Sequence, residues 1–281
     1  MGKSSHLRQN RDKEIGLKQA LKLFCFALLL LPVSALAEFD HSQWDSLLRK
    51  HVKVQGAGVA TQLDYAGMAG DQAQLSAYLA ALAAVDRASF EVWDTASQLA
   101  FLINTYNALT VDLILDDYPD IDSIRDIGFL LSSAWNQDIA SLFGEPVTLD
   151  EIEHEMIRGW DRYKEPRIHF AVNCAAIGCP ALRNEAYVSD RLERQLEEST
   201  KLFLSDRSRN YFDNGRLYVS SIFDWYEEDF ERGWGGIDSV AEFLANYPSE
   251  LGLDGQTVGS LRAGNLRIRY LRYDWDLNDV P

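Results

Sequence analysis

Apolar side chains recur at helical spacing through the first half of the chain, and this spacing predicts three long helices. They span residues 39–52, 72–85 and 96–115. The third is apolar on most of its sides, which predicts a central, buried helix. A fourth helix is predicted from Thr148 to about residue 160, because Thr148-Leu-Asp-Glu151 fits a capping box, in which both side chains bond free backbone N–H groups.

The middle of the second half alternates between apolar and polar positions over residues 167–173. One side of this segment carries Ile168, Phe170 and Val172, and the other carries His169, Ala171 and Asn173. A period of two predicts a half-buried strand. A turn of small residues follows from Cys174 and closes at Cys179-Pro180.

The remaining segments are short. Helices are predicted over residues 189–204, 221–230 and 238–246, and a strand over 266–273. Residues 211–219 form a predicted hairpin, because the Asn-Gly pair at their centre accepts the positive φ angles of a tight turn. The chain is therefore predicted to have an α+β fold, rich in helices, with a small and mostly antiparallel sheet.

The N-terminus has the pattern of a secretory signal peptide. A basic stretch precedes an apolar run over residues 23–31, and Ala35-Leu36-Ala37 fits a cleavage site. The run is about half as long as the roughly 20 residues that span a bilayer, which favours cleavage over an uncleaved anchor. We therefore predict a signal peptide over residues 1–37, one globular domain over residues 38–281, periplasmic or secreted localisation, and no stable membrane span after cleavage.

Charge narrows the choice of partners. Without residues 1–37 the chain keeps 21 basic and 41 acidic residues, a formal charge of −20. Such a surface repels phosphate backbones, so a nucleic-acid partner is not expected. A small-molecule or peptide ligand remains the expected partner, and the sequence leaves the oligomeric state open.

Two asparagines stand in the apolar central helix. Asn104 and Asn107 lie three residues apart and share a face of it. A buried amide without partners costs about 1–3 kcal/mol, so neighbouring groups must bond both. They are predicted either to hold adjoining loops or to line a pocket, where they would orient a ligand or polarise a carbonyl.

A charged stripe follows the capping box. His154 and Arg158 project from one side of the predicted helix, and Glu153 flanks them. The stripe lacks the second histidine of a zinc-protease motif, because Arg158 occupies that position. It is either solvated surface or a site in which Arg158 binds a substrate carboxylate and His154 carries a proton, with Glu153 as a second substrate-binding residue.

His169, Cys174 and Cys179 allow three interpretations. Cys174 is a nucleophile assisted by His169 or His154, or the two cysteines pair as a disulfide after export. In the third, both thiolates and the histidines bind zinc, although the cysteine spacing is at the loose end for such sites. A nucleophile and a permanent disulfide exclude each other.

Several of these segments together resemble one family. In order, they are FLINTYNALT (101–110), LDEIEH (149–154), HFAVNC (169–174) with CPALR (179–183), SIFDWY (221–226) and YDWDLN (273–278). The chain resembles, over nearly all of residues 38–281, the domain-of-unknown-function family numbered 547, for which no activity is assigned. The resemblance implies functional positions at Asn104, Asn107, Glu153, His154, Arg158, His169, Cys174 and Cys179. Because some members are intracellular, it also favours a thiol or metal role over a purely structural disulfide.

The leading hypothesis is a thiol-dependent hydrolase or transferase acting on an amide or thioester. Cys174 is its nucleophile, His169 or His154 its base, and Asn104 or Asn107 orients the base or the substrate carbonyl. One alternative is a non-catalytic envelope binding or scaffold protein with a structural polar core. The other is a zinc-binding protein; otherwise no cofactor is expected.

Overall fold

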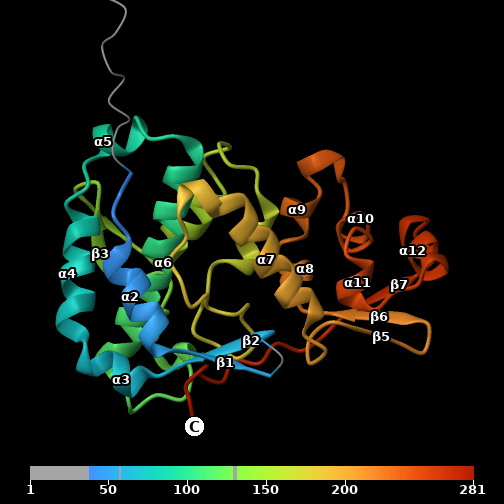
Figure 1. Cartoon of the computed structure of the whole chain (residues 1–281), viewed down its shortest axis with the longest axis horizontal. Coiled ribbons are helices and arrows are strands. Elements are labelled where there is room, and N and C mark those ends of the chain that lie inside the picture. The colour runs from blue at the N-terminus through green and yellow to red at the C-terminus, as the bar shows by residue number, and fades with distance from the viewer. Residues whose placement is uncertain (1–37, 57, 129–131) are drawn as a thin grey trace, which may run out of the picture. The chain divides into compact units, whose positions relative to one another are not determined.

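The computed structural model describes residues 38–56, 58–128 and 132–281 (Figure 1). The predicted signal peptide over residues 1–37 lies outside them. All three long helices predicted in the first half are confirmed, as α2 (Ser42–His51), α4 (Gln72–Ala83) and α6 (Thr95–Asp117). The other α-helices of the described residues are α3 (Tyr65–Gly70), α5 (Arg87–Glu91), α7 (Leu192–Ser205), α8 (Ile222–Trp225), α9 (Glu227–Phe230), α10 (Val240–Leu244), α11 (Pro248–Leu251) and α12 (Gly255–Arg262).

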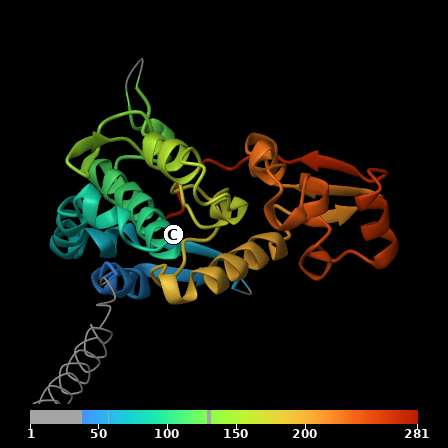
Figure 2. The same ribbon diagram turned by 90° about the horizontal axis from the view of Figure 1, so that it is seen from above.

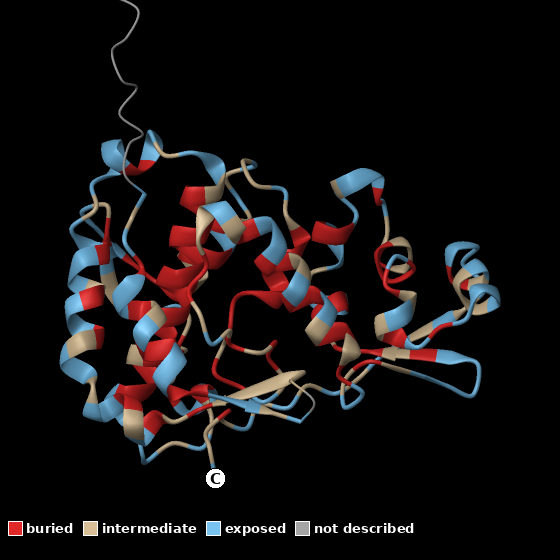
Figure 3. Ribbon diagram, in the orientation of Figure 1, coloured by how far each residue is buried: buried red, intermediate tan, exposed pale blue. Residues whose placement is uncertain are grey.

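Helix α6 is the centre of the first half, as its apolar pattern predicts. It begins where the Asp94 side chain accepts a hydrogen bond from the Ser97 N–H, and it is buried along most of its length (Figure 3). Among the described residues, α6 alone is long and apolar enough to cross a membrane, but 94% of its most apolar window is buried inside the protein. A helix surrounded by protein on every side has the same apolar composition as a membrane span, and here burial explains it.

Two hydrophobic clusters form the interior of the part of the chain that the structure describes. The first surrounds α6 and the helices packed on it, and the second contains Phe170, Phe203, Phe223, Phe230 and Phe243. Helix α7 joins them: its first turns contribute to the first cluster and its last turn to the second. Figure 2 shows α7 running from the α2 side of the molecule toward β5 and β6.

Within the described residues, three small sheets take the place of the single predicted one. Strands β1 (Val52–Gln55) and β2 (Ala60–Leu63) form an antiparallel hairpin, and so do β3 (Ala140–Leu142) and β4 (Glu145–Val147). The third sheet has the order β5 (Tyr211–Asp213), β6 (Arg216–Val219), β7 (Arg267–Tyr270). Its β5–β6 pair is the predicted Asn-Gly hairpin, and β7 adds parallel to β6. The helix-rich α+β class with mostly antiparallel pairing is confirmed.

The prediction of a strand over residues 167–173 is wrong. This segment begins as a 3₁₀ helix, η3 (Pro166–Phe170), with Pro166 in its first turn and the Glu165 side chain accepting from the Arg167 N–H. All five residues of η3 are buried, so the alternation of side chains does not separate a buried face from an exposed one.

Two further predictions need smaller corrections. The helix over residues 221–230 breaks at Tyr226 into α8 and α9, and the Ser221 hydroxyl bonds the Leu271 carbonyl instead of capping the helix. Helix α10 is capped by Ser239, one residue after the predicted start. The capping box at Thr148 is confirmed by both of its hydrogen bonds, 2.8 and 3.0 Å long.

Candidate functional site

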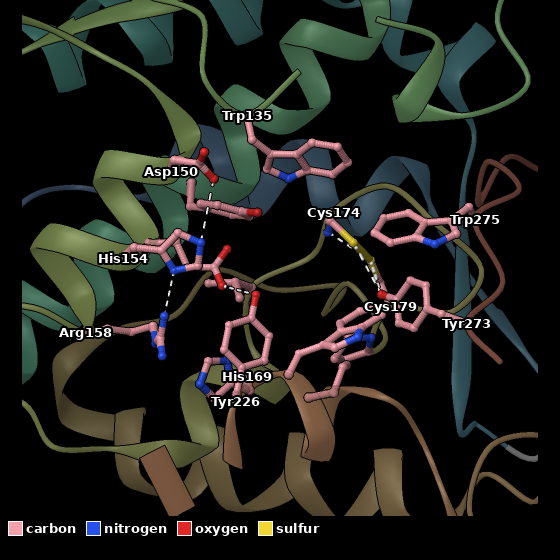
Figure 4. A pocket seen from close by; sticks show the side chains of 16 residues that line it. Trp135, Asp150, His154, Arg158, His169, Cys174, Cys179, Tyr226, Tyr273 and Trp275 are labelled. Carbon is pink, nitrogen blue, oxygen red and sulfur yellow. Dashed lines mark hydrogen bonds and ion pairs between the residues drawn. A yellow bond between two sulfur atoms is a disulfide. The ribbon is translucent and has the colours of Figure 1, made fainter. Parts of the chain in front are cut away.

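A cavity of about 410 Å³ lies where the two hydrophobic clusters meet (Figure 4). Segments far apart in the chain line it: α6, the π-helix η2 (Glu151–Ile157), the cysteine turn, α8 and the C-terminal segment after β7. Six of the eight predicted site residues face it, namely Glu153, His154, Arg158, His169, Cys174 and Cys179. The structure therefore brings together side chains that the sequence places up to 26 positions apart.

The π-helix places Glu153 inside the cavity. Its wider turn bonds the Arg158 N–H to the Glu153 carbonyl at 3.0 Å, and such turns occur often at functional sites. Glu153 is 5% exposed, and its carboxylate accepts a hydrogen bond of 2.7 Å from the Tyr226 hydroxyl. Burial raises the pKa of Tyr106, and the nearby Glu153 raises it further. Tyr106 therefore stays a neutral hydrogen-bond donor. Glu153 makes no ion pair with any residue that the structure describes.

Arg158 connects the exposed and the buried parts of the site. Its Nη1 donates to His154 Nδ1 at 2.7 Å, and its Nε donates to Asp229 Oδ2 at 2.5 Å. Because arginine has no acceptor, His154 Nδ1 must carry a lone pair, which leaves the proton of a neutral ring on Nε2. His154 Nε2 lies 3.6 Å from Asp150 Oδ1. The Arg158 guanidinium also lies 4.9 Å from the ring centre of Tyr226.

His169 is buried behind this arginine. Its Nε2 lies 2.7 Å from Asp229 Oδ2, and its ring stacks on Tyr226 at 3.9 Å. Burial lowers the pKa of His169, although Asp229 opposes the shift, so the ring is neutral at pH 7. Burial would raise the pKa of Asp229, but hydrogen bonds from His169 and Arg158 hold it well below its usual range. His169 Nδ1 is buried with no partner among the described residues.

The cysteines form a disulfide on another wall of the cavity. Cys174 and Cys179 are bonded, and their Cα atoms lie 6.1 Å apart. The disulfide was one of the three interpretations that the sequence left open. Cys179 is 3% exposed, whereas Cys174 is half-buried. Cys179 Sγ accepts from the Cys174 N–H at 3.0 Å and from the Tyr273 hydroxyl at 3.2 Å. Burial raises the pKa of Tyr273, which keeps its hydroxyl protonated.

The sulfurs and the imidazoles do not meet. Figure 4 shows His154 and His169 away from the cysteines, and no described histidine hydrogen-bonds either sulfur. The Tyr273 hydroxyl contacts both sulfur atoms, at 3.4 Å from Cys174 Sγ and 3.2 Å from Cys179 Sγ. A thiol–imidazole pair is therefore not formed in this state of the protein.

The two asparagines lie outside the cavity and hold backbone segments. Asn104 donates to the Tyr187 carbonyl at 2.8 Å and accepts from its N–H at 3.0 Å. Asn107 does the same across two residues, donating to the Ala171 carbonyl at 3.0 Å and accepting from the Asn173 N–H at 2.8 Å. Asn107 thereby fixes the segment that enters the cysteine turn.

Aromatic side chains complete the cavity. Trp275 lies 5.8 Å from both Trp135 and Trp225 and 4.6 Å from Tyr273, measured between ring centres. Trp225 is 47% exposed and marks the rim. Two of the family-like segments contain Trp225, Tyr226, Tyr273 and Trp275. Sequence reasoning missed Asp229 altogether, because a lone aspartate in a short helix has no local signal.

Comparison with known proteins gives a family and no activity. Residues 90–204 match the family described as "Protein of unknown function, DUF547", so the chain carries a DUF547 domain and the predicted resemblance is confirmed over this segment. The family-like segments at 221–226 and 273–278 lie beyond the match. No curated protein and no solved structure matches the chain. Among the described residues, no group of three histidine, cysteine or carboxylate side chains is placed to hold a metal ion.

Proposed function

We propose that the cavity is the active site of an exported, thiol-dependent enzyme in which Cys174 Sγ is the reacting atom. The observation that carries the proposal is that the Cys174–Cys179 disulfide lines the same cavity as the buried Glu153 and the network around Arg158. A small molecule or peptide in this cavity contacts both. In the oxidised form, the chemistry available to such a pair is thiol–disulfide exchange.

The two sulfurs are unequal in a way that suits exchange. A substrate thiolate attacks the half-buried Cys174 Sγ, a new sulfur–sulfur bond forms, and the bond to Cys179 breaks. Cys179 leaves as a thiolate, which the Cys174 N–H and the Tyr273 hydroxyl stabilise. A second substrate thiol then displaces Cys174, so that two substrate thiols become a disulfide and the protein pair becomes a dithiol.

Acyl transfer is the second candidate. Reduction by a dithiol frees Cys174 as a nucleophile in a cavity that also holds Glu153 and the solvent-facing His154, either of which is a candidate proton carrier. Hydrolysis or transfer at an amide or thioester would then proceed only with the reduced protein. Exchange with a thiol starts only from the oxidised protein, so the redox state of the sample separates the two functions.

Single-cysteine variants test the assignment of the reacting atom. In Cys179→Ser, Cys174 remains as a half-buried thiol and is expected to form a mixed disulfide with a small disulfide reagent and to be alkylated. In the matched Cys174→Ser variant, the buried Cys179 is expected to react at least about tenfold more slowly. Mass spectrometry of the folded proteins locates the adduct. Equal rates, or a wild-type disulfide that resists millimolar dithiol in the folded protein, would overturn the proposal in favour of a scaffold protein.

Tyr273→Phe tests the leaving group separately. It removes one of the two hydrogen bonds to Cys179 and keeps the ring that packs on Trp225 and Trp275. The exchange rate is expected to fall several-fold, and the pKa of the released Cys179 thiol to rise, with little change in melting temperature. An unchanged rate and thiol pKa would contradict the assigned role of Tyr273.

The site of action follows from the same chemistry. We propose that residues 1–37 direct export to the periplasm or medium, where a disulfide persists. Fractionation of the native host and sequencing of the mature N-terminus test this. A mature chain that begins at Glu38 supports the proposal, whereas an intact chain in the cytosol contradicts it.

A further inference from the structure

We infer that the cavity binds an organic ammonium group, held between the Glu153 carboxylate and the aromatic side chains of Trp135, Trp225 and Trp275. The inference rests on the proposed function in one respect, namely that the cavity is the ligand site. It does not depend on the sulfur chemistry, because a cation without a thiol would bind in the same place.

The first argument is the unbalanced charge of Glu153. The residue is 95% buried and lines the cavity, and the hydrogen bond from Tyr226 comes from a neutral donor. It has no ion-pair partner among the described residues. A buried carboxylate without a cation is costly, and a cation that enters the cavity supplies the missing partner.

The positive groups nearby do not cancel this charge. Arg158 is paired with Asp229 at 2.5 Å, and its Nη1 is bonded to His154. His169, buried against the same Asp229, is neutral. Asp150 adds a second carboxylate to the lining, with 45% of its side chain exposed. Arg232 lies 3.4 Å from Asp229, and Arg125 lies 5.4 Å from the ring centre of Trp275, but neither lines the cavity. The lining thus has two carboxylates, Glu153 and Asp150, and one guanidinium, that of Arg158, which is already paired. This balance favours a cation over a substrate carboxylate.

The second argument is the aromatic lining. Trp275 and its neighbours form a continuous wall with ring centres 4.6–5.8 Å apart, and Figure 4 shows Trp135, Tyr273 and Trp275 around the space in front of the disulfide. The faces of indole and phenol rings attract cations through their quadrupoles. Trp225 is 47% exposed at the rim, where a ligand would cover apolar surface that now faces water. A neutral sugar would also stack on such a wall, but it leaves Glu153 without a counter-charge.

A titration of the oxidised protein with choline and with its neutral isostere 3,3-dimethylbutan-1-ol separates these possibilities. The two probes have the same shape and differ in charge. Calorimetry is expected to show choline bound about tenfold or more tightly than the isostere, with cadaverine as a primary-amine probe also bound. Equal affinity for both probes, or binding of neutral sugars and of no cation, would overturn the inference.

Variants tie the charge to one side chain. Glu153→Gln is expected to weaken choline binding about tenfold and to leave the isostere unaffected. Glu155→Gln is the matched control, because it removes the same charge from the exposed side of the same helix. Trp225→Leu, at the exposed rim, is a second test that does not disturb the interior. Identical choline affinity in Glu153→Gln and Glu155→Gln would overturn the inference.

The double variant Cys174→Ser, Cys179→Ser separates this inference from the proposed chemistry. It loses any exchange activity but is expected to keep the choline affinity of the wild type within about twofold. Retained binding without exchange in the wild type would refute the chemistry alone. Exchange in the wild type without cation binding would refute the ligand class alone.

Discussion

Replacing Asn107 by alanine tests how the cysteine turn is held in place. Asn107 is 2% exposed, and its side-chain amide bonds two backbone groups, the Ala171 carbonyl and the Asn173 N–H. Asn173 is itself part of the turn, because its side chain bonds the Pro180 carbonyl and the Ala175 N–H. The variant therefore removes the connection between α6 and the turn that carries the disulfide.

The magnitude follows from the two backbone groups that lose their partner. Each buried, unbonded group costs about 1–3 kcal/mol, so Asn107→Ala is expected to lower the free energy of unfolding by about 2–6 kcal/mol. That is a large part of the total stability of about 5–15 kcal/mol of a typical protein. A domain of this size melts about 2–4 °C lower for each kcal/mol lost.

Urea unfolding followed by circular dichroism measures the loss. Thr105→Val is the control from the same buried helix, because the Thr105 hydroxyl bonds only the Phe101 carbonyl, which also lies within the helix. Its loss is expected to stay below about 1 kcal/mol. A loss below about 1 kcal/mol in Asn107→Ala, or an equal loss in both variants, would refute the structural role.

Three further predictions concern charge. Burial lowers the pKa of His41 to about 4, so the unfolded chain binds a proton at this residue more readily than the folded protein, and stability is lost as pH falls from about 6.5 to 4. His41→Asn is expected to reduce that loss by up to about 3 kcal/mol, measured as the free energy of unfolding against pH. Identical pH curves for the variant and the wild type would contradict the prediction. Asp229→Asn is expected to destabilise the protein by about 3–5 kcal/mol in thermal unfolding, because Arg158 loses its buried partner. Since the pKa of Asp229 is depressed, its contribution is present above pH 4 and is lost in acid, so the variant is expected to show a shallower acid limb; a neutral effect at pH 7 would refute the pairing. Oxidised protein is expected to react faster with cysteamine than with 2-mercaptoethanol. Glu153→Gln is expected to lower the ratio of these two rates several-fold. An unchanged ratio would show that Glu153 does not act on a thiol at the exchange site.

The sequence predicted the helical half of the fold because local signals decide it. The apolar period of α4 and α6 and the capping box at Thr148 need no distant partner, and each is found where predicted. The prediction of a strand over residues 167–173 was wrong because distant residues decide the structure of this segment. Arg167 and His169 are polar but buried, because carboxylates from distant segments, Glu193 and Asp229, pair with them. Alternation of residue types signals a half-exposed strand only when the polar side faces water.

Six of the eight predicted residues line one cavity, but the sequence did not indicate how they are arranged there. The hydrogen bonds of Asn104 and Asn107 to loop backbones were one of two alternatives that the sequence could not separate. The hydroxyl beside both sulfurs belongs to Tyr273, whose position depends on a segment 99 residues from Cys174. No spacing rule connects positions so far apart.

That separation has a consequence for biogenesis. The two cysteines leave the ribosome about a hundred residues ahead of Tyr273 and Trp275, which later form the wall in front of them. A growing polypeptide can therefore carry a bonded cysteine pair with neither its phenolic donor nor its indole neighbours. The pocket forms only once the last of its walls has been translated, so an incomplete chain has the cysteine pair without the pocket.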